Sequence, residues 1–168
     1  MNGIAVRVAT PRDLPELTQI YNHYVIHTAI TFDLAPFTVE SRQTWFDAHV
    51  TDPRHRLFAA EEGGRVVGYA STSHFRQKAA YDTTVEASVY CSPSAVGRGI
   101  GGALYRTLFE AIAGEDINRI VAGVTLPNES SIALHRRFGF KPVGTFSSNG
   151  RKFGCYWDVA WFERPLLL

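Results

Sequence analysis

Hydrophobic and polar residues follow two different periodicities along this chain. Short apolar or alternating runs between turn residues predict seven β-strands, at residues 4–9, 57–60, 65–73, 85–91, 119–124, 141–147 and 153–162. Elsewhere, apolar residues recur every three to four positions and predict helices that begin near residues 13, 38, 100 and 128. The order β-α-α-β-β-β-α-β-α-β-β predicts an α/β fold, with one mixed, partly antiparallel sheet and helices on both of its faces.

Residues that prefer helix ends define the helix boundaries more closely. Asp13 predicts the start of the first helix, where Glu16, three residues on, completes a capping box. Thr38 is expected to cap the second helix, and Asn128 the fourth. The fourth helix is expected to end at Gly139, because glycine favours the left-handed conformation of a helix C-cap.

Two glycine-containing turns are expected to join neighbouring strands as hairpins. They are the sequences Glu62-Gly63-Gly64 and Asn149-Gly150. We find no internal repeat, low-complexity segment or linker in the chain. A length of 168 residues therefore predicts one domain, residues 1–168, with a sizeable core.

Composition and charge narrow the class of protein. The net charge is +1, so no strong basic field predicts binding to nucleic acid or to a membrane surface. No apolar run approaches the roughly 20 residues of a membrane span, and the N-terminal residues lack the apolar core of a signal peptide. Cys91 and Cys155 form no CxxC motif and are expected to be two reduced thiols in a cytoplasmic protein; a structural disulfide is the alternative.

Residues 86–102 carry the strongest chemical signal in the sequence. A strand over residues 87–91 leads into a turn that contains glycines at positions 97, 99, 101 and 102 and opens a helix. Glycines let the backbone approach an anion, and the free N–H groups of the first helical turn bind it. Glu86 begins the same strand, so an anion site and a candidate proton acceptor share one element.

Gly97, Gly99 and Gly102 also match the dinucleotide fingerprint G-x-G-x-x-G, which we tested against its usual context. A dinucleotide site requires an acidic residue at the end of the next strand, but the strand at 119–124 ends without one. A P-loop is excluded because no Gly-Lys-Ser/Thr follows the turn. A glycine-rich surface turn without a ligand remains the structural alternative.

Two separated motifs resemble those of the GNAT acetyltransferases. Residues 96–101 are similar to the pyrophosphate loop Gln/Arg-x-x-Gly-x-Gly/Ala, and residues 128–140, NESSIALHRRFGF, to the second coenzyme A motif of that superfamily. Further segments resemble phosphinothricin and methionine sulfoximine acetyltransferases: Asn22-His23-Tyr24, Thr84-Val85-Glu86, Val89-Tyr90, Leu134-His135-Arg136-Arg137, and Lys152-Phe153-Gly154 with Asp158. The chain departs from the pattern at Val96, where the family has Gln or Arg, and we expect weaker coenzyme binding as a result.

The resemblance implies the GNAT fold, a central mixed and largely antiparallel twisted sheet with flanking helices. It also implies acetyl-CoA as co-substrate, no metal, and direct acetyl transfer to an amine in a ternary complex. The residues that would contact the coenzyme are Val89, Tyr90, Cys91, Gly97, Arg98, Gly99, Ile100, Gly101, Gly102, Asn128 and Ser131. A backbone N–H of residues 89–91 would polarise the thioester carbonyl.

The resemblance also assigns catalytic roles. Glu86 would be the general base, against the alternative of a surface ion pair. His135 occupies the position of the superfamily's tyrosine and would protonate the leaving thiolate, or else only pack beside the cofactor. A nucleophilic role for Cys91 is rejected, because no histidine is paired with it in the sequence. His23 and His27 have metal-ligand spacing but lack a carboxylate partner, so we expect no metal site there.

The acceptor is expected to be a small zwitterionic amino-acid analogue. Substrate-binding candidates are Arg76, Gln77, Lys78, Tyr81, Glu86, Ala87 and Ser88, with Phe32 and residues 152–157 as walls. Arg76 would bind the carboxylate, since arginine pairs with it in a bidentate manner; a solvated basic loop is the alternative. The related enzymes are dimers, so a homodimer is expected, with Tyr156, Trp157, Trp161 and Phe162 at the interface or in the core. The alternatives are a GNAT enzyme for protein N-termini or polyamines, and a non-catalytic coenzyme-A-binding regulator.

Overall fold

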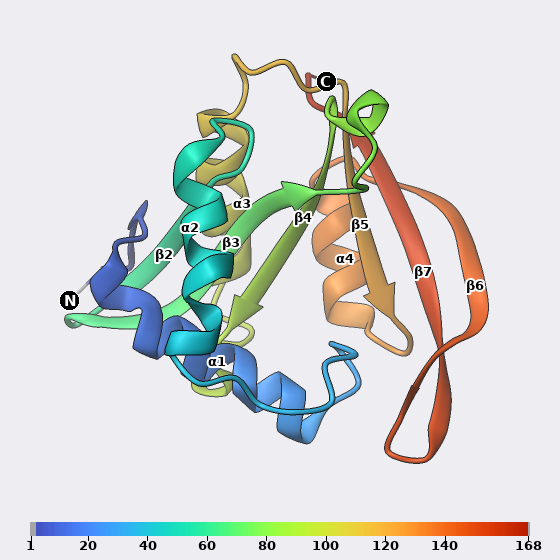
Figure 1. Cartoon of the computed structure of the whole chain (residues 1–168), viewed down its shortest axis with the longest axis horizontal. Coiled ribbons are helices and arrows are strands. Elements are labelled where there is room, and N and C mark those ends of the chain that lie inside the picture. The colour runs from blue at the N-terminus through green and yellow to red at the C-terminus, as the bar shows by residue number, and fades with distance from the viewer. Residues whose placement is uncertain (1–2, 168) are drawn as a thin grey trace.

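A computed structural model describes residues 3–167 as one seven-stranded mixed sheet in the order β1-β2-β3-β4-β5-β7-β6. The strands are β1 (Ala5–Val8), β2 (Leu57–Glu62), β3 (Arg65–His74), β4 (Thr84–Cys91), β5 (Arg119–Thr125), β6 (Lys141–Lys152) and β7 (Cys155–Pro165). The helices are α1 (Leu14–His27), α2 (Gln43–Thr51), α3 (Ile100–Ala111) and α4 (Glu129–Arg137). Helices α1 and α2 cover one face of the sheet, and α3 and α4 lie on the other (Figure 1). The predicted order of elements is confirmed.

The sheet is antiparallel except at one junction. β4 and β5 run parallel, and they pair only from Thr84 opposite Arg119 to Glu86 opposite Val121. A parallel connection needs a crossover, and α3 provides it on the far face of the sheet. The mixed, largely antiparallel sheet predicted from the sequence is therefore confirmed.

Two hydrophobic clusters hold the helices against the sheet. On one face, Leu104, Leu108 and Ile112 pack against strand residues such as Val85 and Ala87. On the other face, α1 and α2 pack against β2 and β3 through a cluster of Leu14, Leu17, Ile20, Phe46, Leu57, Ala59, Val66 and Tyr69. Because side chains alternate along β4, its even-numbered residues face α1 and α2, on the opposite side from Val85 and Ala87.

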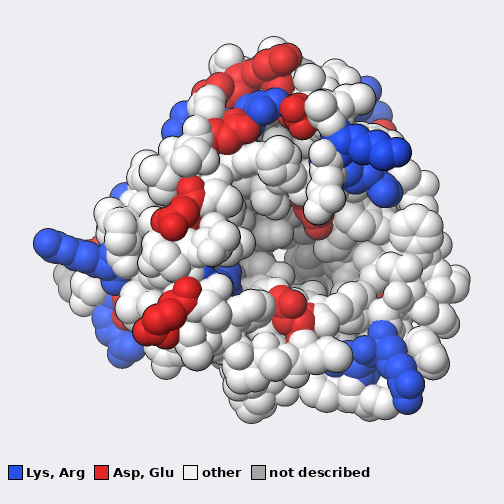
Figure 2. Space-filling view, in the orientation of Figure 1, with Lys and Arg blue, Asp and Glu red and all other residues white. Residues whose placement is uncertain are grey.

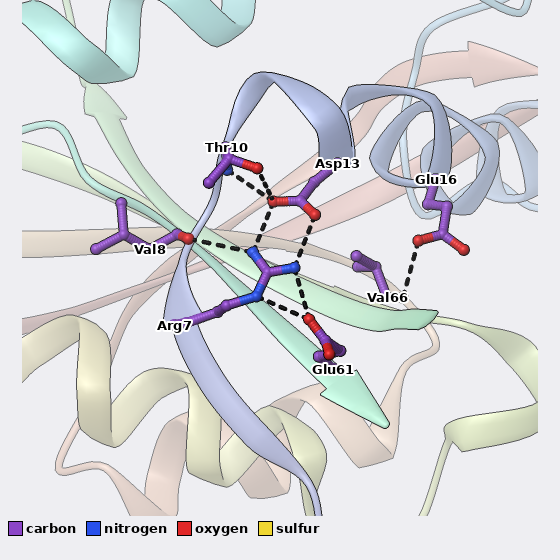
Figure 3. Close-up of polar contacts among 7 residues, drawn as sticks. All are labelled: Arg7, Val8, Thr10, Asp13, Glu16, Glu61 and Val66. Atoms are coloured by element: carbon purple, nitrogen blue, oxygen red, sulfur yellow. Dashed lines mark hydrogen bonds and ion pairs between the residues drawn. The ribbon is translucent and has the colours of Figure 1, made fainter. Parts of the chain in front are cut away.

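The capping box predicted from Asp13 to Glu16 is wrong. A 3-10 turn at Pro11–Asp13 precedes α1, and the Asp13 carboxylate accepts from the Thr10 backbone N–H at 2.7 Å and from the Arg7 guanidinium at 2.7 and 2.8 Å (Figure 3). Glu16 instead accepts from the backbone N–H of Val66 at 2.9 Å. The prediction failed because both carboxylates are used to connect α1 to the sheet.

The predicted Asn149-Gly150 hairpin turn is also wrong. β6 continues to Lys152, and the turn consists of Phe153 and Gly154, both with positive φ, 53° and 75°. Two central residues with positive φ are typical of a type I′ turn, whose twist matches that of the two strands it joins. Gly150 lies inside β6, just after a register shift that begins at Phe146.

The predicted ends of α4 are confirmed, whereas Thr38 lies before a 3-10 turn and the N-cap of α2 is Arg42. The hydroxyl of Thr38 accepts from the Ser41 backbone N–H at 3.1 Å, at the 3-10 turn that leads into α2. The side chain of Asn128 accepts from the Ser131 backbone N–H at 3.2 Å, and Gly139 has a φ of 79°. The structure describes Cys91 and Cys155 as free cysteines. No helix within residues 3–167 is long and apolar enough to cross a membrane.

Candidate active site

The sheet opens into a cleft where β4 and β5 separate. After Glu86 and Val121 the two strands no longer pair, and they diverge with α4 behind the gap (Figure 1). Residues 87–91 of β4 continue to pair with β3 on their other edge. Backbone groups of this segment that point toward β5 are therefore free to bind an extended ligand.

The glycine turn lies at the end of β4 and is open to solvent. Gly97 and Gly99 have φ values of 81° and 80°, and a Cβ built on either would meet no atom of residues 3–167 within 4 Å. Gly99 is the N-cap of α3, so the first backbone N–H groups of that helix have no helical partner and can bind an anion. The turn thus retains the predicted phosphate-binding geometry.

Two predicted coenzyme contacts, Ile100 and Arg98, have side chains that are engaged within the protein. Ile100 is buried in the core, so only its backbone N–H is available to a ligand. Arg98 pairs with Glu62 of β2, with an Nη1–Oε2 distance of 3.0 Å, which offsets the charge expected to face the phosphates. Gly101 lies close to α4, where an added Cβ would be 3.2 Å from the side chain of Leu134.

A cavity of about 50 Å³ occupies the gap between β4 and β5. It brings together seven predicted site residues, namely Ala87, Ser88, Val89, Tyr90, Asn128, Ser131 and His135. The segment Gly123–Thr125 of β5 and Tyr105 of α3 complete its lining, together with Ile30. Predicted site residues of β4 and α4 therefore line one cavity, which does not include Glu86 or Cys91.

His135 lies in this cavity as a neutral imidazole with both nitrogens engaged. Its Nδ1 is 2.7 Å from the carbonyl oxygen of Ser131, and its Nε2 is 3.1 Å from the hydroxyl of Tyr105. A carbonyl only accepts, so Nδ1 carries the hydrogen and Nε2 accepts from Tyr105. Burial lowers the pKa of His135, with the Ser131 carbonyl acting in the opposite direction. In this arrangement Nε2 is suited to accept a proton rather than to donate one.

A second, larger cavity of about 180 Å³ lies on the other face of β4, beneath α1 and α2. The face of the molecule in Figure 2 is hollowed at its centre. The cavity is lined by Tyr21, Asp33, Phe37, Ser41, Arg42, Trp45, Tyr69, Ser71, Ser73, Ser88 and Tyr90. Ser88 and Tyr90 line both cavities, so the two are separated by a single strand.

Glu86 lies beside this larger cavity, although it is not part of its lining. It is on the same face of β4 as Ser88 and Tyr90, and it pairs in register with Ser73 of β3. Burial raises the pKa of its carboxyl group, and no ion pair with Glu86 occurs in the part of the chain that the structure describes. The alternative of a surface ion pair therefore does not apply.

The segment from β3 to β4 lies outside both cavities. Arg76, Gln77 and Lys78 are exposed, and a 3-10 turn at Ala79–Tyr81 follows them. The guanidinium of Arg76 lies 4.9 Å from the Phe75 ring centre and 5.8 Å from that of Tyr81. These contacts order the loop, but as the structure stands its cations face solvent.

The loop after α1 closes one side of the larger cavity. Tyr21 donates to Asp33 and lies 2.7 Å from the hydroxyl of Thr31, and burial followed by Asp33 raises the pKa of Tyr21 to about 12. The buried ammonium of Lys152 donates to the Thr31 carbonyl at 2.7 Å. These contacts support the expectation that residues near Phe32 and β6 form a wall.

Sequence reasoning missed Tyr105 and Arg42. Tyr105 lies in the apolar stripe of α3, where it resembles a core residue. Arg42 precedes the apolar pair of α2 and resembles a surface residue, yet it is only 4% exposed. In the sequence, the only indication that Arg42 is buried is its position three and four residues before the apolar Trp45 and Phe46.

Cys91 and a cluster of Asp52, His55 and His74 contain further groups that could react or bind a metal. Burial raises the pKa of Cys91 to about 11, which agrees with the rejection of a thiolate nucleophile. Asp52, His55 and His74 form a cluster, missed in the sequence, whose ligand atoms lie within 4.8 Å of one another. Arg54 already binds both carboxylate oxygens of Asp52, so a cation there would have to compete with the guanidinium.

Comparisons with known proteins agree with this geometry. Residues 6–161 match the family described as acetyltransferase (GNAT) domain. The chain is 53% identical to a phosphinothricin N-acetyltransferase of Streptomyces coelicolor, over 97% of this chain and 96% of that one. It is 35% identical to an L-methionine sulfoximine/L-methionine sulfone acetyltransferase of Pseudomonas paraeruginosa, over 96% and 94% of the two chains. A crystal structure of a GNAT superfamily phosphinothricin acetyltransferase from Sinorhizobium meliloti, in complex with AcCoA, superimposes with a TM-score of 0.91 at 34% identity, covering 96% of this chain and 88% of that one.

Proposed function

This chain belongs to the GNAT acetyltransferase family and is an acetyl-CoA-dependent N-acetyltransferase, and we propose that it acetylates the α-amino group of a small amino-acid analogue. The relatives named for phosphinothricin, methionine sulfoximine and methionine sulfone support this acceptor class. The observation that carries the proposal is the separation of β4 from β5. It leaves the backbone of residues 87–91 free between the open glycine turn and Glu86.

Acetyl-CoA would supply a thioester as the acetyl donor. Its diphosphate would lie at the backbone N–H groups of residues 97–102, where the N-terminus of α3 favours negative charge. Its extended arm would pair with the free edge of β4, in the gap that β5 leaves open. A backbone N–H of residues 89–91 would then stabilise the oxyanion as the amine attacks the carbonyl. Collapse of this intermediate would break the C–S bond and release coenzyme A as a thiolate, which takes up a proton from solvent.

Glu86 would act as the general base that takes a proton from the attacking amine. A carboxylate with a raised pKa is a better base near neutral pH than an exposed one. Glu86 is the last residue of β4 that pairs with β5, and it is on the same face of the strand as Ser88 and Tyr90, which line the larger cavity. This position fits an amine that enters from the α1–α2 side. His135 and Tyr105 line the donor side of the strand, where they would surround the thioester.

The exposed cations Arg76 and Lys78 remain proposed contacts at the rim of the acceptor site. A zwitterionic acceptor with an oxyanion head would find both within the loop that joins β3 to β4. A homodimer and a cytoplasmic location also remain proposals. The exposed apolar side chains of the β6–β7 hairpin, Val143, Phe146, Phe153 and Tyr156, support an interface there.

The proposal is tested by steady-state acetylation of phosphinothricin, methionine sulfone and methionine sulfoximine. For the wild-type protein we expect turnover of at least one of these acceptors. For Glu86→Gln we expect kcat to fall by about 10²–10⁴-fold with little change in the KM for acetyl-CoA, because a general base contributes that factor. The matched control is Glu110→Gln, which removes an exposed carboxylate from α3.

Unchanged turnover in Glu86→Gln would remove Glu86 from the mechanism. Turnover only of peptide N-termini or polyamines would contradict the acceptor class.

A further inference from the structure

Arg42 is a buried cation without a carboxylate partner. It is 4% exposed, and its guanidinium carbon lies 4.2 Å from the ring centre of Tyr21 and 3.9 Å from that of Trp45. No Asp or Glu among residues 3–167 forms an ion pair with it, and its Nη1 is buried without a hydrogen-bond partner there. A buried charge is costly unless an opposite charge or hydrogen bonds compensate it, so an anionic ligand at Arg42 would be stabilised.

The cavity that Arg42 lines is otherwise rich in hydroxyl groups. Ser71, Ser73 and Ser88 line it from β3 and β4, and Tyr69 and Tyr90 lie further along the same strands. The hydroxyl of Tyr69 is also buried and unpaired within the described chain. Burial raises the pKa of the Tyr69 hydroxyl. The positive charge of Arg42 lowers it, which shows that the guanidinium lies close to this hydroxyl. The hydroxyls and the guanidinium can donate together to one oxyanion.

The cavity contains one carboxylate, and that group is already engaged. Asp33 accepts from the hydroxyl of Tyr21, on the side of the cavity formed by the loop after α1. The hydroxyl row, by contrast, leads back toward the proposed base. Ser73 pairs with Glu86, Ser71 with Ser88, and Tyr69 with Tyr90. A ligand whose anionic end reaches Arg42 therefore extends from the neighbourhood of Glu86.

We propose that this cavity binds an oxyanion of the acceptor, a carboxylate or a phosphinate, with Arg42 as its counter-ion and the β3–β4 hydroxyls as further donors. The inference rests on the proposed function and makes Arg42 a specificity-determining residue of that site. The exposed Arg76 and Lys78 are then available for a second anionic group at the rim.

The test is steady-state kinetics with three acceptors that differ in charge. Phosphinothricin has a carboxylate and a phosphinate, methionine sulfone has only the carboxylate, and methionine sulfone amide has neither. In Arg42→Gln we expect the KM for acceptors that carry the bound oxyanion to rise about 10- to 100-fold, because the lost contact is a charge-assisted hydrogen bond. The kcat should stay within about threefold of the wild-type value. Arg42→Lys should recover part of the loss.

The acceptor series identifies which oxyanion is bound. If Arg42 binds the carboxylate, Arg42→Gln weakens phosphinothricin and methionine sulfone alike and leaves the amide unchanged. If it binds the phosphinate, only phosphinothricin is weakened. Both results support the inference. An equal loss for all three acceptors, including the amide that has no oxyanion, would overturn it.

Arg164→Gln is the matched control for removing a buried arginine. Arg164 is 6% exposed, and its donors bind the carbonyls of Phe138, Pro165 and Leu166. This variant should lose stability without any change in acceptor KM. If Arg42→Gln does not fold, Ser71→Ala decides the question, with an expected rise of about three- to tenfold in the KM for charged acceptors only.

A binding measurement separates failure of this inference from failure of the proposed function. Sodium dimethylphosphinate and sodium acetate should raise the melting temperature of the wild-type protein more than that of Ser71→Ala or Arg42→Lys. That result would support the oxyanion site even if the wild type acetylates none of the three acceptors. Equal shifts in all variants would overturn the site, whatever the turnover.

Discussion

At the scale of single residues, burial shifts the pKa values of Glu86 and His135 in opposite directions, each toward the uncharged form. Burial disfavours charge, so it raises the pKa of the Glu86 carboxyl and lowers that of the His135 imidazole. Glu86 is thereby a base that titrates closer to neutral pH. The lowered pKa of His135 favours the neutral ring, with its Nδ1 hydrogen directed at the Ser131 carbonyl. The strand β4 thus separates two proton acceptors.

These directions predict the pH dependence of acetyl transfer. A base works when deprotonated, so kcat should fall as pH decreases through the raised pKa of Glu86, above 4.5. An acid at His135 would instead make kcat fall as pH increases through its pKa, below 6.5. We therefore expect kcat to rise to a plateau and not to decline between pH 6.5 and 8.

Pre-steady-state acetylation across pH 5–8.5 measures this profile. Tyr105→Phe should keep the same shape, since the Tyr105 hydroxyl donates to Nε2 and supplies no charge. A declining limb that is present in the wild type and absent in His135→Asn would contradict the neutral ring and restore the acid role predicted from the sequence.

At the scale of elements, Gly150 of β6 controls the position of the loop after α1. A Cβ on Gly150 would lie 2.3 Å from ring atoms of Phe32, so the ring packs directly on the strand backbone. Phe32 is flanked by Thr31, which accepts from Lys152, and by Asp33, which lines the larger cavity. Displacing Phe32 would therefore change the wall of the acceptor site.

We expect Gly150→Ala to raise the acceptor KM severalfold and to lower stability by about 1–3 kcal/mol, the usual cost of overpacking. Gly144→Ala is the control, because a Cβ at Gly144 of the same strand meets nothing within 4 Å in the described chain. Thermal unfolding and acceptor kinetics of both variants provide the measurement. Identical behaviour of the two variants would show that the Phe32 contact does not shape the site.

The same element shows what the sequence could and could not predict. The alternation of apolar residues identified the seven strands of the described chain, and the helical spacing identified its four α-helices, because both patterns report burial on one face. The sequence Asn149-Gly150 was interpreted as a turn. Local composition cannot reveal that Phe32, more than a hundred residues earlier, needs a glycine opposite it. Likewise, motif spacing found residues 97–102 and Glu86. Arg42 and Tyr105 depend on tertiary packing and carry no local signal.

At the scale of the whole molecule, β6 is one of the two edge strands of the sheet and is largely exposed along its twelve residues. An edge strand presents unpaired backbone groups, and Val143 and Phe146 add exposed apolar area to it. Proteins protect such edges, and a second copy of the chain would cover this one. The hairpin also contributes Lys152 and Gly150 to the wall of the acceptor site, so an interface there would stabilise that wall.

We therefore expect two 18.7 kDa chains to associate in solution, as measured by sedimentation equilibrium at micromolar concentration. Val143→Lys combined with Phe146→Lys should shift the protein toward the monomer and raise the acceptor KM, because the hairpin loses its cover. Val50→Lys introduces the same charge at an exposed apolar position of α2 and should leave the assembly intact. A wild-type protein that sediments as a monomer would contradict the interface. A dimer unaffected by the β6 substitutions would place the contact on another surface.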